Sequence, residues 1–131
     1  MFAQFARSII KKEDLILHTT GETTRNYCYT ADAASGILIV LAKGNSGEAY
    51  NIANAKTTSS IAGMAKFLCD NFGNGTSRCI FDIQKSETDY GYYPTTKISL
   101  VTNKISKLGW TAKTDLYEMF DRTIASLKLK T

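Results

Sequence analysis

Tyr93 and Lys97 are the residues whose spacing most directly suggests catalytic chemistry. They lie four positions apart, and on a helix this spacing places a phenol and an ammonium group on one face, where the cation lowers the phenol pKa. Pro94 follows Tyr93 directly. Proline lacks an amide donor and disfavours helical geometry at the residue before it. We therefore expect an extended segment in which the two side chains point apart, so no catalytic residue is predicted.

The three cysteines indicate neither a metal centre nor a disulfide framework. Cys28, Cys69 and Cys79 are an odd number and lack the Cys-x-x-Cys spacing of zinc sites. A reduced, cytoplasmic environment suits them best. We expect Cys69, Cys79 and Trp110 to be core residues.

Length and composition limit the architecture and the partners. The chain has 131 residues, 44% of them apolar, which is enough for one core and too few for two ordinary domains. Residues 1–131 are therefore predicted to be a single domain. The 16 basic and 12 acidic residues give a net charge of +4, which is too mild for a nucleic-acid arm and too mixed for a disordered tail. No apolar run approaches the roughly 20 residues of a membrane span, so neither nucleic acid nor a membrane is an expected partner.

Apolar residues recur at helical intervals in five segments of the chain. This periodicity predicts amphipathic helices, each with one face against a core. The segments are residues 2–12, 30–43, about 61–71, 99–108 and 115–127.

The ends of these helices carry capping signals. Thr30 can cap the second helix and Gly44 closes it, and we expect this alanine-rich helix to be well buried. Asp32 suits the start of the same helix, where its carboxylate meets free amides. Thr114 is predicted to cap the last helix.

Four short runs are typical of strands and lie between the helices. The first two are separated by a turn, so we expect a hairpin or two adjacent strands. The element order is α-β-β-α-β-α-β-α-α, and four short strands are too few for a doubly wound sheet. A small α/β layer of α+β character is predicted. The runs are residues 15–18, 25–29, 47–53 and 79–83, and a long tyrosine-rich loop follows at 84–96.

Five ordered segments resemble one enzyme family. The run from Leu15 to Asp32, LILHTTGETTRNYCYTAD, is similar without a gap to the pattern L-x-(V/I)-Y-G-x-G-x-x-x-R-D-(F/W)-x-Y-V-x-D of the extended short-chain dehydrogenases, the NAD-dependent sugar-nucleotide epimerases and dehydratases. The other matches are GNSGEAYNI at 44–52, the helix at 58–65, Asn103-Lys104 with Leu108-Gly-Trp110, and Arg122-Thr-Ile124. Together they span residues 15–124.

The resemblance implies the C-terminal, substrate-binding region of such an enzyme. In this family a Rossmann half carries a glycine-rich turn for NAD and a catalytic Tyr-x-x-x-Lys, and neither is found here in its proper setting. The glycine pairs follow expected helices, where they act as stops or turns, so we expect no NAD to bind this chain. The resemblance implies two partners, a nucleotide-diphosphate sugar and the missing Rossmann half. Alone, the chain is expected to be inactive. The pairs are Gly44 with Gly47 and Gly73 with Gly75.

Arg25 and His18 are substrate-binding candidates implied by the resemblance. Arg25 occupies the position of the family arginine that contacts diphosphate or ribose, which planar guanidinium donors suit. An ion pair with Glu22 or Asp32 is the alternative for Arg25. His18 replaces a common family tyrosine beside the base. It could stack or hydrogen-bond there, or be a structural residue at a strand end.

Lys97 and Tyr93 complete the candidate set. Lys97 is the cation nearest to the place where relatives carry a second arginine, and it could act there as a point charge. A solvated loop lysine is the alternative. Tyr93 could line a sugar or base pocket, or simply cover the core.

Two functions remain open from the sequence. The first is a substrate-binding fragment of a nucleotide-sugar epimerase or dehydratase that contributes phosphate and base contacts. The second is a stand-alone small α/β binding or scaffolding module that has lost the ligand.

Overall fold

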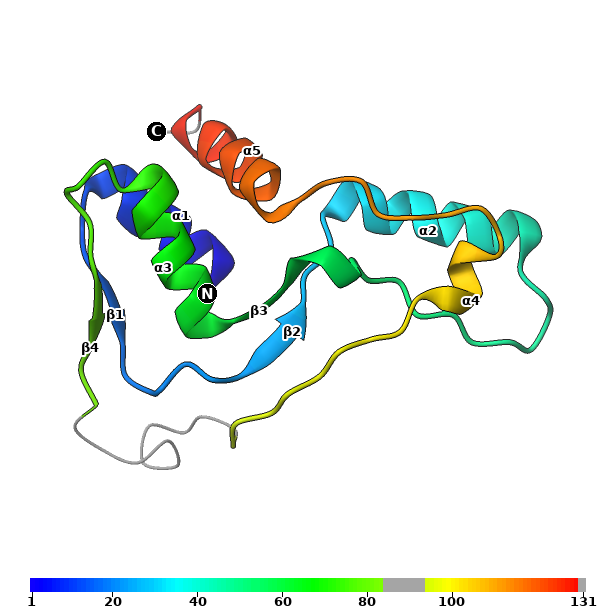
Figure 1. Cartoon of the computed structure of the whole chain (residues 1–131). Helices are drawn as coiled ribbons and strands as arrows, with labels where there is room; N and C mark the ends of the chain where they lie inside the picture. The colour runs from blue at the N-terminus through cyan, green and yellow to red at the C-terminus, as the bar shows by residue number, and fades with distance from the viewer. Residues whose placement is uncertain (84–93, 130–131) are drawn as a thin grey trace. The chain divides into compact units, whose positions relative to one another are not determined.

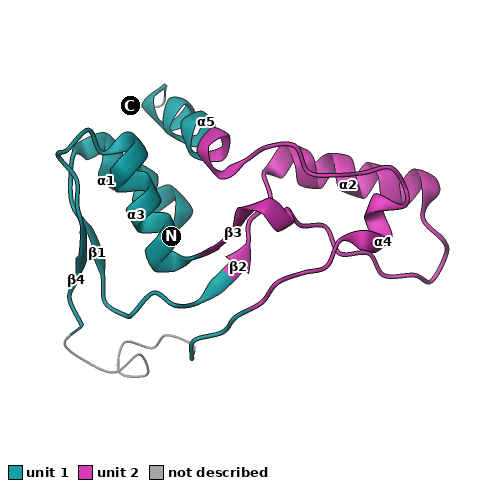
Figure 2. Ribbon diagram, in the orientation of Figure 1, with its two compact units in different colours: residues 1–24, 60–97, 120–131 teal, residues 25–59, 98–119 magenta. Residues whose placement is uncertain are grey.

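The computed structural model describes residues 1–83 and 94–129, which form helices and short strands in two compact units (Figure 1). Figure 2 colours the units separately. Each unit is built from chain segments that are far apart in the sequence. Unit 1 combines Met1–Thr24, Ser60–Lys97 and Phe120–Thr131, and unit 2 combines Arg25–Ser59 and Ile98–Met119.

The sheet of unit 1 is a parallel pair of strands. β1 (Leu15–Leu17) pairs with β4 (Cys79–Phe81), and Leu15 lies opposite Cys79. The expected hairpin between the first two strands is therefore wrong. β2 (Thr24–Asn26) pairs instead with β3 (Thr58–Ser60), because strand partners in this chain are set by long-range packing rather than by the short turn.

The core of unit 1 lies between helices and this sheet. α1 (Phe2–Lys11) and α3 (Ile61–Phe72) contact each other and β1. Each helix buries residues three or four positions apart, which confirms the amphipathic pattern. Phe2 also stacks on Phe120, with ring centroids 4.1 Å apart. The buried apolar side chains of these elements are Phe5, Ala6, Ile9, Leu15, Leu17, Met64, Ala65 and Leu68.

α3 begins as the sequence predicts. The Ser60 hydroxyl accepts a hydrogen bond of 2.9 Å from the Gly63 amide, which satisfies one of the free amides at the helix start. Gly73 ends the helix, and its amide donates to the Cys69 carbonyl. Asn74 and Gly75 then adopt positive φ in the turn toward β4.

Unit 2 contains α2 (Thr30–Lys43), whose bounds match the prediction. Its expected burial is wrong, because Gly36 is the one buried residue of this helix. Leu38 and Leu41 are 65% and 77% exposed. Gly36 is buried because its backbone lies against Trp110, which is 5% exposed and confirmed as a core residue. The Trp110 indole donates to the Ser35 hydroxyl at 2.9 Å.

Asp32 does not cap α2. Its Oδ2 accepts hydrogen bonds from the Lys113 amide at 3.0 Å and the Thr114 amide at 2.8 Å. Thr30 is the first residue of the helix, and the N-cap residue Tyr29 makes no side-chain cap. The Asp32 carboxylate therefore fixes the segment before the last helix, because two amides there lack a nearer acceptor.

The strand expected at 47–53 is absent. The segment instead satisfies polar groups through side chains: the Asn45 amide donates to the Tyr50 hydroxyl, and the Asn51 side chain donates to the Val101 carbonyl, both at 3.0 Å. A 3₁₀ turn, η1 (Ala55–Thr57), leads from it into β3.

The last two helices differ in how well the sequence predicts them. α4 (Asn103–Ser106) is shorter than the expected helix at 99–108. α5 (Leu116–Lys128) matches closely, but Asp115 rather than Thr114 accepts from the Glu118 amide, at 2.9 Å. Within residues 1–83 and 94–129, no helix is both long and apolar enough to cross a bilayer.

Candidate functional site

His18 and Asp82 meet at one edge of the unit 1 sheet. His18 directly follows β1 and Asp82 directly follows β4. Since the strands are parallel, their carboxyl ends lie at the same edge, which is where ligands commonly bind in open α/β sheets. The His18 Nδ1 lies 3.2 Å from the Asp82 carbonyl oxygen and 3.8 Å from its Oδ2. Both side chains are about two-fifths exposed, so a solvent-borne molecule can reach them.

Arg25 lies on β2 in unit 2 and is half-buried. Burial raises the pKa of the Tyr27 phenol, and the positive charge of Arg25 opposes that rise, so these alternate residues interact electrostatically. The Asp32 carboxylate accepts hydrogen bonds from the Lys113 and Thr114 amides.

The Asn26 side chain holds the segment around Arg25 in place. Its Nδ2 donates to the Thr58 hydroxyl at 2.6 Å, and its Oδ1 accepts from the Leu100 amide at 2.6 Å. These bonds tie the end of β2 to the chain on both sides of it. The backbone that carries Arg25 is therefore well anchored.

Lys97 is exposed and lies beside the start of β2. It forms an isolated parallel bridge with Thr24, and the Thr24 amide donates to the Thr96 carbonyl at 2.9 Å. Residues 94–97 are not helical, in agreement with the expectation for the stretch around Pro94. Tyr93 lies outside the described residues, so its place relative to Lys97 stays a prediction.

The three predicted site residues that the structure describes thus fall in both units. His18 and Lys97 belong to unit 1 and Arg25 belongs to unit 2, although Arg25 directly follows the Thr24 that pairs with Lys97. Their roles as ligand contacts stay predictions.

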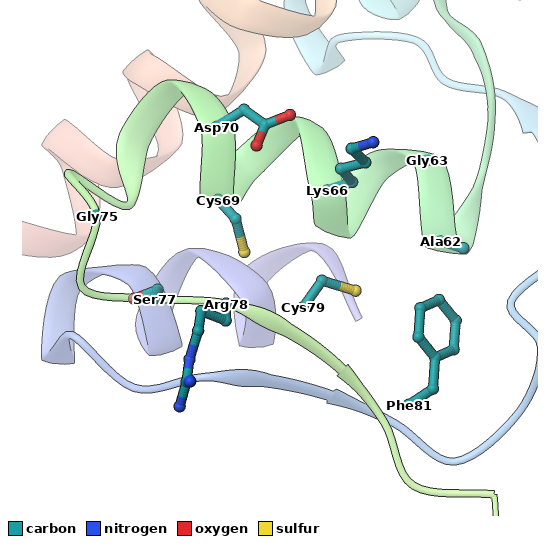
Figure 3. Close-up of a pocket in the computed structure, with 10 residues that line it drawn as sticks. All are labelled: Ala62, Gly63, Lys66, Cys69, Asp70, Gly75, Ser77, Arg78, Cys79 and Phe81. Carbon is teal, nitrogen blue, oxygen red and sulfur yellow. The ribbon is translucent and has the colours of Figure 1, made fainter.

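An open hollow of about 690 Å³ between α3 and β4 is a feature that the sequence did not reveal (Figure 3). Cys79 and Phe81 are alternate residues of β4 and Ser77 lies two positions before it, so all three share the face that looks toward the helix. The helix contributes side chains at helical spacing. Both patterns are visible in the sequence, but the pairing of this strand with this helix is not. The lining residues from α3 are Ala62, Gly63, Lys66, Cys69 and Asp70.

Cys69 and Cys79 are not core residues, contrary to expectation. Both are half-buried and line the hollow. Burial raises the pKa of each thiol, and proximity to Cys79, Asp70 and Asp14 raises that of Cys69 further. The two thiols are therefore close enough to influence each other. The third cysteine, Cys28, is also half-buried, and it belongs to unit 2.

Ser77 places an unsatisfied polar group in the same hollow. Its side chain is 5% exposed, and its hydroxyl has no hydrogen-bond partner among the described residues. A buried hydroxyl in this state commonly bonds to water or to a ligand.

Among the described residues, no glycine-rich turn joins a strand to a helix. A pyrophosphate needs a glycine-rich turn between a strand and a helix, but β3 runs directly into α3, and the segment between β2 and α2 contains no glycine. The described part of the chain also contains no group of three or more His, Cys, Asp or Glu side chains that could hold a metal.

Comparisons with known proteins point to one family. Residues 1–53 match the model of the NAD dependent epimerase/dehydratase family. The chain is 27% identical over 125 residues to the trifunctional UDP-glucose 4,6-dehydratase/UDP-4-keto-6-deoxy-D-glucose 3,5-epimerase/UDP-4-keto-L-rhamnose-reductase of Arabidopsis thaliana, a match that covers 95% of this chain and 18% of that protein. It is 31% identical over 108 residues to the dTDP-D-glucose 4,6-dehydratase of Bos taurus, covering 82% of this chain and 30% of that enzyme.

The fold is shared with solved members of this group. UDP-glucose 4-epimerase of Thermotoga maritima, solved with UDP-glucose, superposes with a TM-score of 0.80 at 22% identity. The match covers 98% of this chain and 39% of that structure. The chain therefore spans well under half the length of each of these proteins.

Proposed function

We propose that this chain is the C-terminal, substrate-binding portion of an NAD-dependent epimerase/dehydratase and that residues 1–131 act as one region. It contributes phosphate and base contacts to a nucleotide-diphosphate sugar. NAD and the hydride-transfer machinery belong to a Rossmann half outside residues 1–131. On this proposal, the chain alone binds substrate weakly and does not turn it over.

The observation that carries the proposal is the position of Arg25 in the matched segment. Residues 1–53 fit the family model, and within them Arg25 stands on an anchored strand with its neighbour Asn26 bonded on both sides. A guanidinium held on fixed backbone suits bidentate contact with a diphosphate. His18 supplies an imidazole for the base, and Lys97 and Tyr93 supply further contacts.

Isothermal titration calorimetry of the chain with UDP-glucose and dTDP-glucose tests this function. We expect measurable binding of at least one nucleotide sugar, and a loss of about tenfold or more in affinity for Arg25→Ala, because a charged hydrogen bond to phosphate contributes roughly 1.5–3 kcal/mol. Arg7→Ala is the matched control: Arg7 is an exposed arginine on α1, so its removal should leave the affinity unchanged.

Other results would contradict the proposal. Equal losses in Arg25→Ala and Arg7→Ala would show that net charge, rather than a specific contact, drives binding. No binding to either nucleotide sugar would favour the stand-alone module that has lost the ligand. Tight binding of NAD alone would contradict the assignment of the cofactor to another part of the enzyme.

A further inference from the structure

We propose that Cys69 and Cys79 form a dithiol site that a low-molecular-weight disulfide converts into an intramolecular disulfide between α3 and β4. This modification is independent of nucleotide-sugar binding. It would link the helix to the strand that leads to Asp82.

The path of the chain brings the two cysteines onto neighbouring elements. α3 ends at Gly73, and the turn through Asn74 and Gly75 returns the chain along the helix as β4. Cys69 is in the last turns of the helix, and Cys79 is the first residue of the strand. In Figure 3 both side chains project into the gap between these two elements.

Two further observations indicate that the thiols are near each other and on a common wall. Each lines the same hollow, and the charge of one affects the ionisation of the other. The alternation of Ser77, Cys79 and Phe81 turns the strand face with the thiol toward α3. Disulfide formation requires thiols on neighbouring elements, and α3 and β4 are in contact with each other.

The hollow also gives small oxidants a route to the sulfur atoms. It is open, with a volume of about 690 Å³, and Gly63 and Ala62 leave its helix wall without large side chains. Cys28 belongs to unit 2 and does not line this hollow.

The chemistry is two successive thiol–disulfide exchanges. The thiolate of one cysteine attacks glutathione disulfide, forms a mixed disulfide and releases one glutathione thiolate, which takes up a proton. The second cysteine thiolate then attacks the protein sulfur of that mixed disulfide and releases the second glutathione. Two protein thiols are oxidised, and one glutathione disulfide is reduced to two thiols.

Mass spectrometry of the whole chain tests the proposal. The reduced chain is incubated with glutathione disulfide under native conditions, remaining thiols are blocked with iodoacetamide, and the product is digested with trypsin. Cleavage after Lys66, Arg78 and Lys85 separates the two cysteines into peptides 67–78 and 79–85. We expect these two peptides joined by a disulfide, and the Cys28 peptide carrying the alkyl group.

Matched variants define the controls. Cys28→Ser should still form the linked peptides, whereas Cys79→Ser should instead retain one glutathione on Cys69. A urea-unfolded sample should form disulfides to Cys28 as often as the disulfide between Cys69 and Cys79. The same mixture in the native sample would overturn the proposal. So would stable glutathione adducts on both cysteines of the wild-type chain, disulfide-linked dimers, or no reaction at either thiol.

Discussion

Gly21 offers a sharp test of how the unit 1 backbone is packed. It adopts a φ of +66°, and a Cβ placed there would lie 2.8 Å from the Ala62 amide nitrogen and 2.9 Å from the Ala62 Cβ. The Ala62 amide also donates to the Gly21 carbonyl at 2.9 Å. Gly21→Ala therefore adds a left-handed backbone penalty of roughly 1–2 kcal/mol and a clash of roughly 1–3 kcal/mol. We expect a total loss of about 2–5 kcal/mol in the free energy of unfolding.

Gly75→Ala is the matched control for this substitution. Gly75 has a φ of +73°, belongs to the same unit, and has no atom within 4 Å of an added Cβ. It should lose only the backbone contribution, roughly 1–2 kcal/mol. Urea unfolding followed by circular dichroism at the helix band compares the two variants. Equal destabilisation would refute the close approach of Gly21 to Ala62 as the cause.

Three further substitutions test individual hydrogen bonds by the same unfolding measurement. Asp32→Asn should destabilise by about 1 kcal/mol at neutral pH. Burial alone would raise the pKa of Asp32, but hydrogen bonds from Thr114 and the preceding amide together lower it. The advantage of Asp32 over Asn is therefore complete above the ordinary Asp pKa of about 3.9 and fades as the pH falls through the lower folded-state value; an unchanged difference at low pH would contradict this. Ser60→Ala removes the bond to the Gly63 amide and should cost about 1 kcal/mol, and no loss would show that the cap is unimportant. Asn54→Ala leaves the Thr114 carbonyl without its 2.8 Å donor at a buried site, and we expect a loss of about 1–3 kcal/mol, larger than that of Ser60→Ala.

Sequence periodicity located helices well because a helix is defined by contacts close in the sequence. Residues 2–12, 30–43 and 115–127 correspond to α1, α2 and α5 within a residue or two. Burial was harder to predict. The apolar run of α2 resembles a core helix, yet its large side chains are mostly exposed, because hydrophobicity does not show which surface covers a helix.

Strand pairing could not be derived from the same information. Three-residue strands carry little pattern, and their partners lie far away in the sequence, so the short turn between β1 and β2 suggested a hairpin that does not form. The alternating residues at 47–53 resemble a strand, but the Tyr50 and Asn51 side chains bond backbone groups directly. Side-chain hydrogen bonds to the backbone therefore take the place of pairing with a neighbouring strand.

The site residues show a similar division. The resemblance selected Arg25, His18, Lys97 and Tyr93 as types suited to a nucleotide sugar. It did not reveal that His18 contacts Asp82, because their meeting depends on the parallel pairing of β1 with β4. Cys69 and Cys79 were expected in the core because side-chain type predicts average burial. It does not predict where a hollow forms.

The parallel pairing of β1 with β4 also constrains how the chain can fold during synthesis. Leu15 and Cys79 face each other in this pair, so β1 has no strand partner until the ribosome has made β4. By then the segment Arg25–Ser59 of unit 2 has already been synthesised. Closing such a long loop is entropically costly and slows folding. Unit 1 moreover consists of three separate stretches of chain, so no continuous fragment carries unit 1 without also carrying the segments of unit 2.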